Sequence, residues 1–204
     1  MAKPDLNSLK NGLRIERRIE MSYGICKICG CTDHNPCFNY KHGFCWWTTP
    51  EHDVCSHCYG GVVPKDDPYT IHCVDGMEFP VLTVHQPYAL MLVEGVKETE
   101  YRNWKLPEKY VGQRIFIHAS KTMDDFDPHY SDKETFYKYM ADAYDDELAG
   151  MIIGSVVFGK SQGPFPGMLY DSPKPIYKWP VEKPIRLSHP LVVPGKQGIW
   201  KIKF

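Results

Sequence analysis

Seven of the eight cysteines of this chain lie close together, between residues 26 and 58. The first and last pairs form the motifs CKIC and CSHC, in which two residues separate the cysteines. Two such turns each offer two thiolates, and together they complete the tetrahedral shell that Zn²⁺ prefers. The spacing predicts a zinc site with the ligands Cys26, Cys29, Cys55 and Cys58. Four cysteine ligands leave no open position for a substrate, so we expect a structural role for the ion.

Because three further cysteines lie between these pairs, the sequence is compatible with one zinc ion or with two. These three cysteines could alternate as ligands of the first ion, or they could hold a second ion together with a nearby histidine. The residues concerned are Cys31, Cys37 and Cys45, with His34, His42 or His57 as the histidine. Disulfides and an iron–sulfur cluster are the alternatives for these thiols. Disulfides need an oxidising compartment, and the first residues carry charges where a signal peptide needs an apolar stretch.

The composition is that of an ordinary globular protein. Of the 204 residues, 43% are hydrophobic, 13% are aromatic and 24% are charged, which excludes wholesale disorder. No apolar run approaches the roughly 18 residues of a membrane span. We therefore expect a soluble, cytoplasmic protein with no membrane partner.

Charge is distributed unevenly along the chain. The formal net charge is −1, but residues 122–149 contain nine acidic residues and only two lysines. If this acidic segment lies to one side, the rest of residues 77–204 presents a basic surface that attracts phosphates. The alternative is a solvated acidic helix on an ordinary surface.

Composition and periodicity divide the chain into four parts. Residues 1–22 are expected to form a helix or arm, and residues 23–60 a loop-rich zinc-binding subdomain. Residues 61–76 are rich in Gly, Pro and Asp, which is typical of a linker. Residues 77–204 then form the main domain.

The main domain combines short strands with two clear helices. The segments FPVLTVHQ, QRIFIHAS and MIIGSVVFGK predict strands, and the C-terminal stretch predicts further short ones. One helix is expected to begin at Pro87, and a second to begin with a capping box from Ser131 to Glu134. This mixture indicates an α+β fold, a small β-barrel with flanking helices.

Five motifs of the main domain, in order, resemble those of the ASCH family, whose fold is similar to the PUA RNA-binding barrel. They are VLTVHQPYA, GVKETEYRNW, GQRIFIHASK, GSVVFG and YKWPVEKPIRLSHPLVVPGKQGIWKI. Members of that family are thought to bind RNA or other nucleic acid in a cleft. The resemblance implies that this chain binds RNA, a single-stranded or modified nucleic acid, or a nucleotide.

Carried over motif by motif, the resemblance places three turns in the cleft. They contribute His85, Gln86, Pro87 and Tyr88, then Lys97, Glu100 and Arg102, and then His118, Ser120 and Lys121. Tyr88 and Trp104 offer flat faces for base stacking, and the basic side chains can meet phosphates. The histidines could instead belong to the core, and Glu100 with Arg102 could be a structural ion pair.

Two enzymatic functions stay open for the same cleft, with Lys97, Glu100 and His118 as the catalytic candidates. A metal-independent ribonuclease needs an acid, a base and cations. His85 or His118 with Glu100 could exchange the protons, and Lys97 with Arg102 could supply the cations. One ASCH branch removes acetyl groups from modified cytidine, using a lysine and a hydroxyl residue three positions later. Here Glu100 stands at that second position, so the hydroxyl is lost.

The cysteine window resembles a motif of bacteriophage and prophage proteins. The matching stretches are CKICGCTD, CWW and PEHDVCSHC, although the loop between Cys37 and Cys45 is longer than usual. This resemblance suggests a bacterial or phage-infected host cell.

Overall fold

The computed structural model describes residues 24–61, 63, 67–72, 74–128, 131–166 and 174–203. The helix or arm predicted for residues 1–22 lies outside these ranges, as does Cys73. Among the described helices, none is long and apolar enough to cross a membrane.

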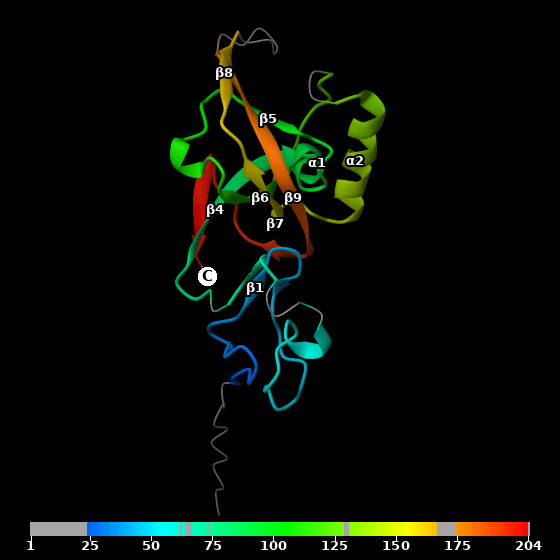
Figure 1. Ribbon diagram of the computed structural model, residues 1–204. Coiled ribbons are helices and arrows are strands. Elements are labelled where there is room, and N and C mark those ends of the chain that lie inside the picture. The colour runs from blue at the N-terminus through cyan, green and yellow to red at the C-terminus, as the bar shows by residue number, and fades with distance from the viewer. Residues whose placement is uncertain are drawn as a thin grey trace, which may run out of the picture.

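A seven-stranded mixed sheet dominates the structure (Figure 1). The strand order is β10-β4-β6-β7-β9-β5, and β8 pairs with β9 beside this path. β4 and β6 are parallel, and the other neighbours are antiparallel. The bounds are β4 Glu78–Gln86, β5 Thr99–Arg102, β6 Arg114–Met123, β7 Met151–Phe158, β8 Gln162–Phe165, β9 Ile176–Val192 and β10 Ile199–Lys203. With few helices beside it, this sheet confirms the α+β class.

The predicted closed barrel is wrong, because the strand path has two ends. Among the described strands, β5 and β10 do not pair with each other. β10 pairs with β4 only as far as Leu82. Just beyond, the carbonyl of Thr83 accepts a hydrogen bond of 3.1 Å from the guanidinium of Arg102 on β5. A side chain thus spans the opening where a barrel would need a backbone ladder.

One face of the sheet is covered by α1 (Tyr88–Val93), and α2 (Lys133–Asp145) packs against α1. All six residues of α1 are buried, and alternate residues of β4 and β6, such as Leu82 and Ile117, pack in the same core. α1 follows Pro87 as predicted. α2 is capped by Asp132, whose carboxylate accepts from the backbone N–H of Thr135, so the predicted cap at Ser131 is wrong by one residue.

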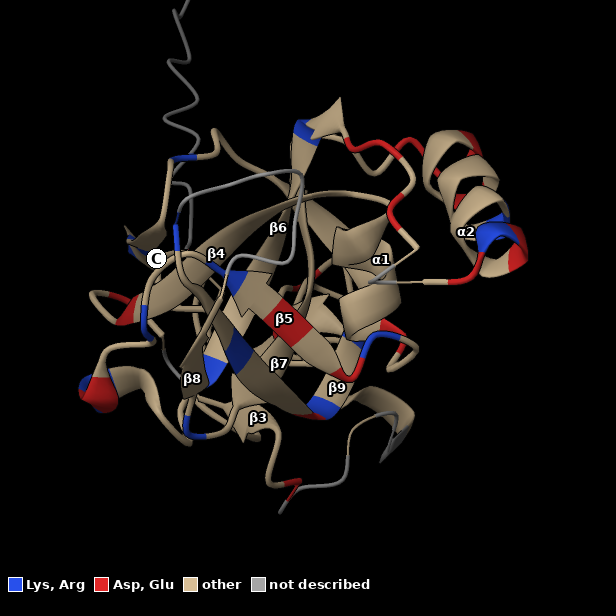
Figure 2. Cartoon of the chain, turned by 90° about the horizontal axis from the view of Figure 1, so that it is seen from above, with Lys and Arg blue, Asp and Glu red and all other residues tan. Residues whose placement is uncertain are grey.

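The acidic helix α2 lies beside the sheet and not across it (Figure 2). The acidic segment as a whole is nevertheless not confined to that side, because Asp124, which belongs to it, lines a pocket described below. Two short 3-10 turns complete the helical structure, η1 (Tyr59–Gly61) and η2 (Glu108–Tyr110).

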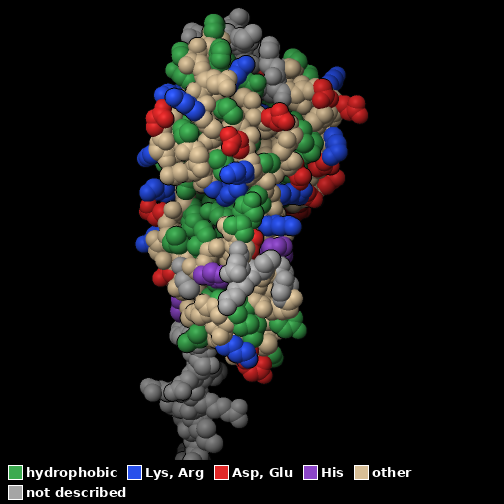
Figure 3. Space-filling view, in the orientation of Figure 1, with side chains coloured by type: hydrophobic (Ala, Val, Ile, Leu, Met, Phe, Trp, Pro, Cys, Tyr) green, Lys and Arg blue, Asp and Glu red, His purple; other side chains and the backbone are tan. Residues whose placement is uncertain are grey.

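The cysteine-rich part of the chain packs on the opposite face of the sheet, as a lobe we call the thiol lobe (residues 24–61 and 67–72). Its only described strands are three pairs of residues in a small sheet of order β2-β1-β3, namely β1 Phe38–Asn39, β2 Gly43–Phe44 and β3 Thr70–Ile71. Phe38 is completely buried, and its ring lies edge-on to Phe116 of β6 at 5.4 Å between centroids. Hydrophobic side chains also gather on the surface where the two parts meet (Figure 3).

Gly154 of β7 gives a test of how tightly the helices and strands pack. A Cβ atom at this position would lie 2.6 Å from Cγ1 of Val93 and would collide with the carbonyl oxygen of Ile185. Gly154→Ala is expected to lower the free energy of unfolding by about 1–3 kcal/mol, measured by urea denaturation. Gly159→Ala is the control, because its new Cβ would meet side-chain atoms alone, the end of Glu182 at 3.3 Å and Pro180 at 3.4 Å. Equal losses in the two variants would contradict this account.

Candidate functional site

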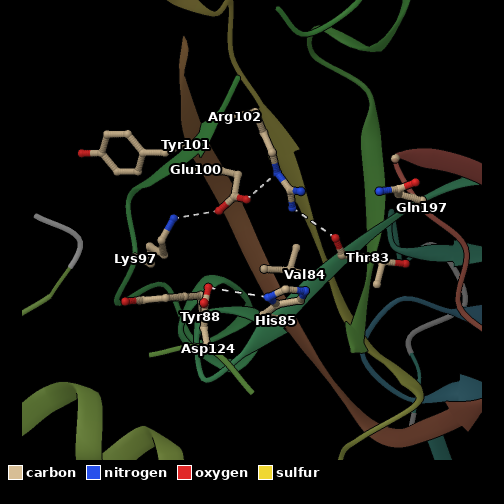
Figure 4. A pocket seen from close by; sticks show the side chains of 11 residues that line it. Thr83, Val84, His85, Tyr88, Lys97, Glu100, Tyr101, Arg102, Asp124 and Gln197 are labelled. Carbon is tan, nitrogen blue, oxygen red and sulfur yellow. Dashed lines mark hydrogen bonds and ion pairs between the residues drawn. The ribbon is translucent and has the colours of Figure 1, made fainter. Parts of the chain in front are cut away.

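A cavity of about 380 Å³ lies at the opening between β4 and β5 (Figure 4). Its volume is within the range of small-molecule sites. The lining comes from β4, α1, β5, the segment after β6 and the turn before β10, which are far apart in sequence. We call this cavity the β4–β5 pocket, and its lining residues are Thr83, Val84, His85, Tyr88, Lys97, Glu100, Tyr101, Arg102, Asp124, Gln197 and Gly198.

A chain of three buried or partly buried charges forms one wall of the pocket. Oε2 of Glu100 lies 2.7 Å from Nζ of Lys97, and Oε1 lies 2.8 Å from Nε of Arg102. Glu100 is 4% exposed and Lys97 is 6% exposed. The carboxylate therefore has a cation on each oxygen, and the wall as a whole carries one net positive charge.

Local structure explains why these three side chains meet. Glu100 and Arg102 are two residues apart on β5, so both side chains point to the same face. Lys97 follows the end of α1, where Gly95 has a φ of 77° and the Lys97 N–H donates to the carbonyl of Met91. The tight turn after α1 brings the lysine back beside the strand that it precedes.

Burial and charge act against each other at this wall. Burial lowers the pKa of Lys97, and the positive charge of Arg102 acts in the same direction against the attraction of Glu100. For Glu100, burial favours the neutral acid, but Lys97 and Arg102 together hold its pKa below the usual value. Glu100 is thus a carboxylate at neutral pH.

The remainder of the pocket offers aromatic faces and a histidine–carboxylate pair. Nζ of Lys97 lies 5.6 Å from the ring centre of Tyr88 and 5.2 Å from that of Tyr101. Next to Tyr88, Nδ1 of His85 lies 3.7 Å from a carboxylate oxygen of Asp124, and both side chains are about half exposed (Figure 4). The pocket can therefore receive a flat, polar ligand in contact with charges of both signs.

The residues predicted from the motifs separate into three groups. His85, Tyr88, Lys97, Glu100 and Arg102 line the β4–β5 pocket together. His118, Ser120 and Lys121 line a second cavity of about 650 Å³, which shares Thr83 and Gln197 with the first. His118 therefore does not lie beside Lys97 and Glu100, the other two catalytic candidates.

Three predicted residues line neither cavity. Gln86 is completely buried and its Oε1 accepts from the backbone N–H of Leu90, while Pro87 is the N-cap of α1. Trp104 packs edge-on against Trp179 of the core at 4.6 Å between ring centres. Trp104 is partly buried and lines neither cavity, so its predicted role in base stacking has no support from these two cavities.

Sequence reasoning missed several lining residues. Tyr101 stands between two predicted residues, and strand alternation alone would have directed it away from them. Asp124 is one of nine acids in its segment, and nothing in the pattern distinguishes it. Gln197 reaches the pocket from the C-terminal segment, so its position depends on the pairing of β10 with β4.

The seven described cysteines are thiols gathered in the thiol lobe. Three groups of side chains each have all their donor atoms within 4.8 Å of one another. They are Cys26, Cys29, Cys31 and Cys55; Cys31, Cys37 and Cys45; and Cys29, Cys37 and His72. Each set could hold a metal ion. Cys58, predicted as a ligand, is outside these sets, but its thiol hydrogen-bonds with Cys29 and Cys55.

The buried centre of the thiol lobe consists of these thiols. The cluster contains Cys26, Cys31, Cys37 and Cys55, with Trp47 as the one hydrophobic residue of another type packed on it among the described residues. Burial raises the pKa of Cys26, but backbone N–H groups of Cys55 and neighbouring residues lower it to about 6. Such N–H donors stabilise a thiolate, the form that binds metal.

The similarities found between this chain and known proteins are weak. No protein-family model and no curated protein matches the sequence. Among solved structures, the crystal structure of a mutant ZmASCH protein from Zymomonas mobilis is similar, with a TM-score of 0.36 and 14% sequence identity. The match covers 56% of this chain and 75% of that one.

The buried charge chain predicts a large stability effect for one substitution. Glu100→Gln leaves two buried cations without their carboxylate, and we expect it to reduce the free energy of unfolding by about 3–5 kcal/mol. Glu108→Gln is the matched control, because Glu108 forms an exposed pair of 2.8 Å with Lys105 at the same i,i+3 spacing. The control should cost less than about 1 kcal/mol in the same urea titration. Similar losses would show that Glu100 is not a buried counter-ion.

Proposed function

We propose that the β4–β5 pocket binds a nucleotide or a nucleotide unit of single-stranded RNA or modified nucleic acid. The observation that carries this proposal is the combination of the Lys97–Glu100–Arg102 wall with the rings of Tyr88 and Tyr101 around one small cavity. A flat heterocycle can stack on an aromatic ring, and the charged wall can hydrogen-bond its polar edge.

The second cavity supports the same proposal, because it offers cations next to the pocket. Lys121 and Lys196 line it, and Gln197 is shared by the two cavities. A base held in the β4–β5 pocket would leave its phosphates near these two lysines. The contacts would then divide into a stacking part and an electrostatic part, as in other single-strand-binding proteins.

The resemblance to the ASCH family adds to this argument. Five residues that the motifs selected from separate parts of the sequence line one pocket, which supports ASCH membership for residues 77–204. Under this proposal, residues 23–60 are a zinc-binding subdomain, with a structural zinc ion held by the CKIC and CSHC cysteines. Residues 61–76, predicted as a linker, connect it to the main domain and contribute strand β3 to its small sheet. A lobe centred on thiols has little apolar core of its own, so metal binding would supply its stability.

A ribonuclease is the second candidate function, and one pair of residues favours it. His85 faces Asp124 at 3.7 Å in the same pocket as Glu100. A carboxylate that faces a histidine orients its ring for proton transfer, as general acid–base catalysis requires. His85 thereby replaces His118 as the histidine of this function.

Tyr101→Ala tests base binding. If the ring stacks on a base, the substitution should weaken the affinity for nucleoside monophosphates or a short RNA about 5- to 150-fold, measured by calorimetric titration. Tyr144→Ala is the control, because Tyr144 is 75% exposed on α2 and lines neither cavity. No binding by the wild type, or equal loss in both variants, would refute the proposal. Cleavage of the RNA during the titration would favour the ribonuclease.

Salt dependence tests the role of the second cavity. If Lys121 and Lys196 each neutralise one phosphate, the double alanine variant should reduce the slope of log affinity against log salt by about 1.4, or about 0.7 for each contact with a single strand. Lys105→Ala, which removes the cation of the exposed pair with Glu108 and lies outside both cavities, should leave the slope unchanged. An unchanged slope in the double variant would place the phosphates elsewhere.

A further inference from the structure

We propose that the thiol lobe binds two metal ions, the second one through Cys31, Cys37, Cys45 and His72. This proposal rests on the structural zinc site proposed above and adds both a second ion and its histidine ligand. From the sequence we expected one or two ions, with His34, His42 or His57 as the histidine ligand of the second. The donor atoms, their spacing and the small sheet favour two ions and His72 as that ligand.

The number of donors matches two complete tetrahedral shells. The described part of the thiol lobe contains seven thiols, and His72 is the histidine found in a donor set with them. The CKIC and CSHC cysteines supply four thiolates to the first ion, and four donors remain for the second. His34, His42 and His57 belong to none of the donor sets among the described residues.

The distances between donor atoms fit this assignment. Ligands bonded to zinc at about 2.3 Å place neighbouring sulfurs about 3.8 Å apart at the corners of a tetrahedron. The sulfurs of Cys31 and Cys45, in the second shell, are 3.7 Å apart, and those of Cys29 and Cys55, in the first, are 3.8 Å apart. The two shells adjoin, because the sulfurs of Cys29 and Cys37 are 3.6 Å apart and His72 forms a donor set with both. Nδ1 of His72 lies 3.1 Å from the sulfur of Cys37, so the ring nitrogen points toward the proposed shell.

The small sheet explains how three of these ligands come to lie in a row. Phe38 on β1 pairs with Phe44 on β2 and with Ile71 on β3. One step along each antiparallel ladder, Cys37 stands opposite Cys45 on one side and His72 on the other. Residues directly opposite on neighbouring strands point to the same face of a sheet. The hydrogen bond from the Cys45 N–H to the Cys37 carbonyl, of 3.0 Å, continues the first ladder to this row.

The second ion has a definite structural role in this arrangement. Cys37 is followed directly by Phe38, the ring that packs on Phe116 of the large sheet. An ion that joins β2, β1 and β3 at Cys37 would fix the strand from which this ring projects.

Native mass spectrometry of the full chain, reconstituted with zinc, tests the proposal by counting ions. The wild type should carry two zinc ions, and His72→Ala should lose one at a chelator concentration at which the wild type keeps both. His72→Cys should restore the second ion, because it completes a shell of four thiolates. His34→Ala is the control and should keep two ions.

The outcomes are distinguishable from a failure of the first zinc site. A wild type with no zinc would refute both sites, whereas a wild type with one ion would refute only the second. Two ions in His72→Ala under the same chelator would remove His72 from the ligands. If His72→Ala does not fold, the cobalt-substituted protein decides. His72→Cys adds a thiolate and should increase the sulfur-to-cobalt charge-transfer absorbance, and unchanged absorbance would overturn the assignment.

Discussion

The buried carboxylate of Glu100 is the interaction on which the ligand pocket depends. A charge that is almost completely removed from water is stable only when it is paired, and here both oxygens are paired, with Lys97 and Arg102. Arg102 in turn reaches the carbonyl of Thr83 on β4. Through these two cations, one carboxylate connects the turn after α1, strand β5 and strand β4, the elements that line the β4–β5 pocket.

Periodicity and composition predict much of this fold because the spacing of apolar residues shows which side chains must be buried in a core. Strands β4, β6 and β7 and the helix after Pro87 were predicted in place, since each has a run of apolar side chains that must face a core. The C-terminal stretch was predicted as short strands, but it contains the single long strand β9. The predicted small barrel is not closed, because closure depends on whether two distant strand edges pair, and here the Arg102 side chain spans the opening in place of a backbone ladder. Ser131 was displaced as a cap by its neighbour Asp132, a choice that a motif of four residues does not resolve.

The two candidate sites differ in what sequence could reveal about them. Knuckle spacing is local, so the thiols of the metal site were apparent at once. His72 was missed because it lies outside the window, and only the pairing of β3 with β1 brings it to Cys37. In the pocket, motifs indicated Lys97 and Glu100 but also Trp104, because a motif marks a segment without showing whether a side chain faces the cavity or the core.

The burial of Phe38 limits how far the two parts can be treated as separate modules. Its ring shares one apolar cluster with Val81 and Phe116 of the large sheet, and Val74 completes the same cluster from the segment between the two parts. A shortened protein that began after this segment would expose that face of the sheet as a continuous apolar patch, a surface prone to self-association. The lobe thus protects the sheet from self-association, because it covers this apolar face.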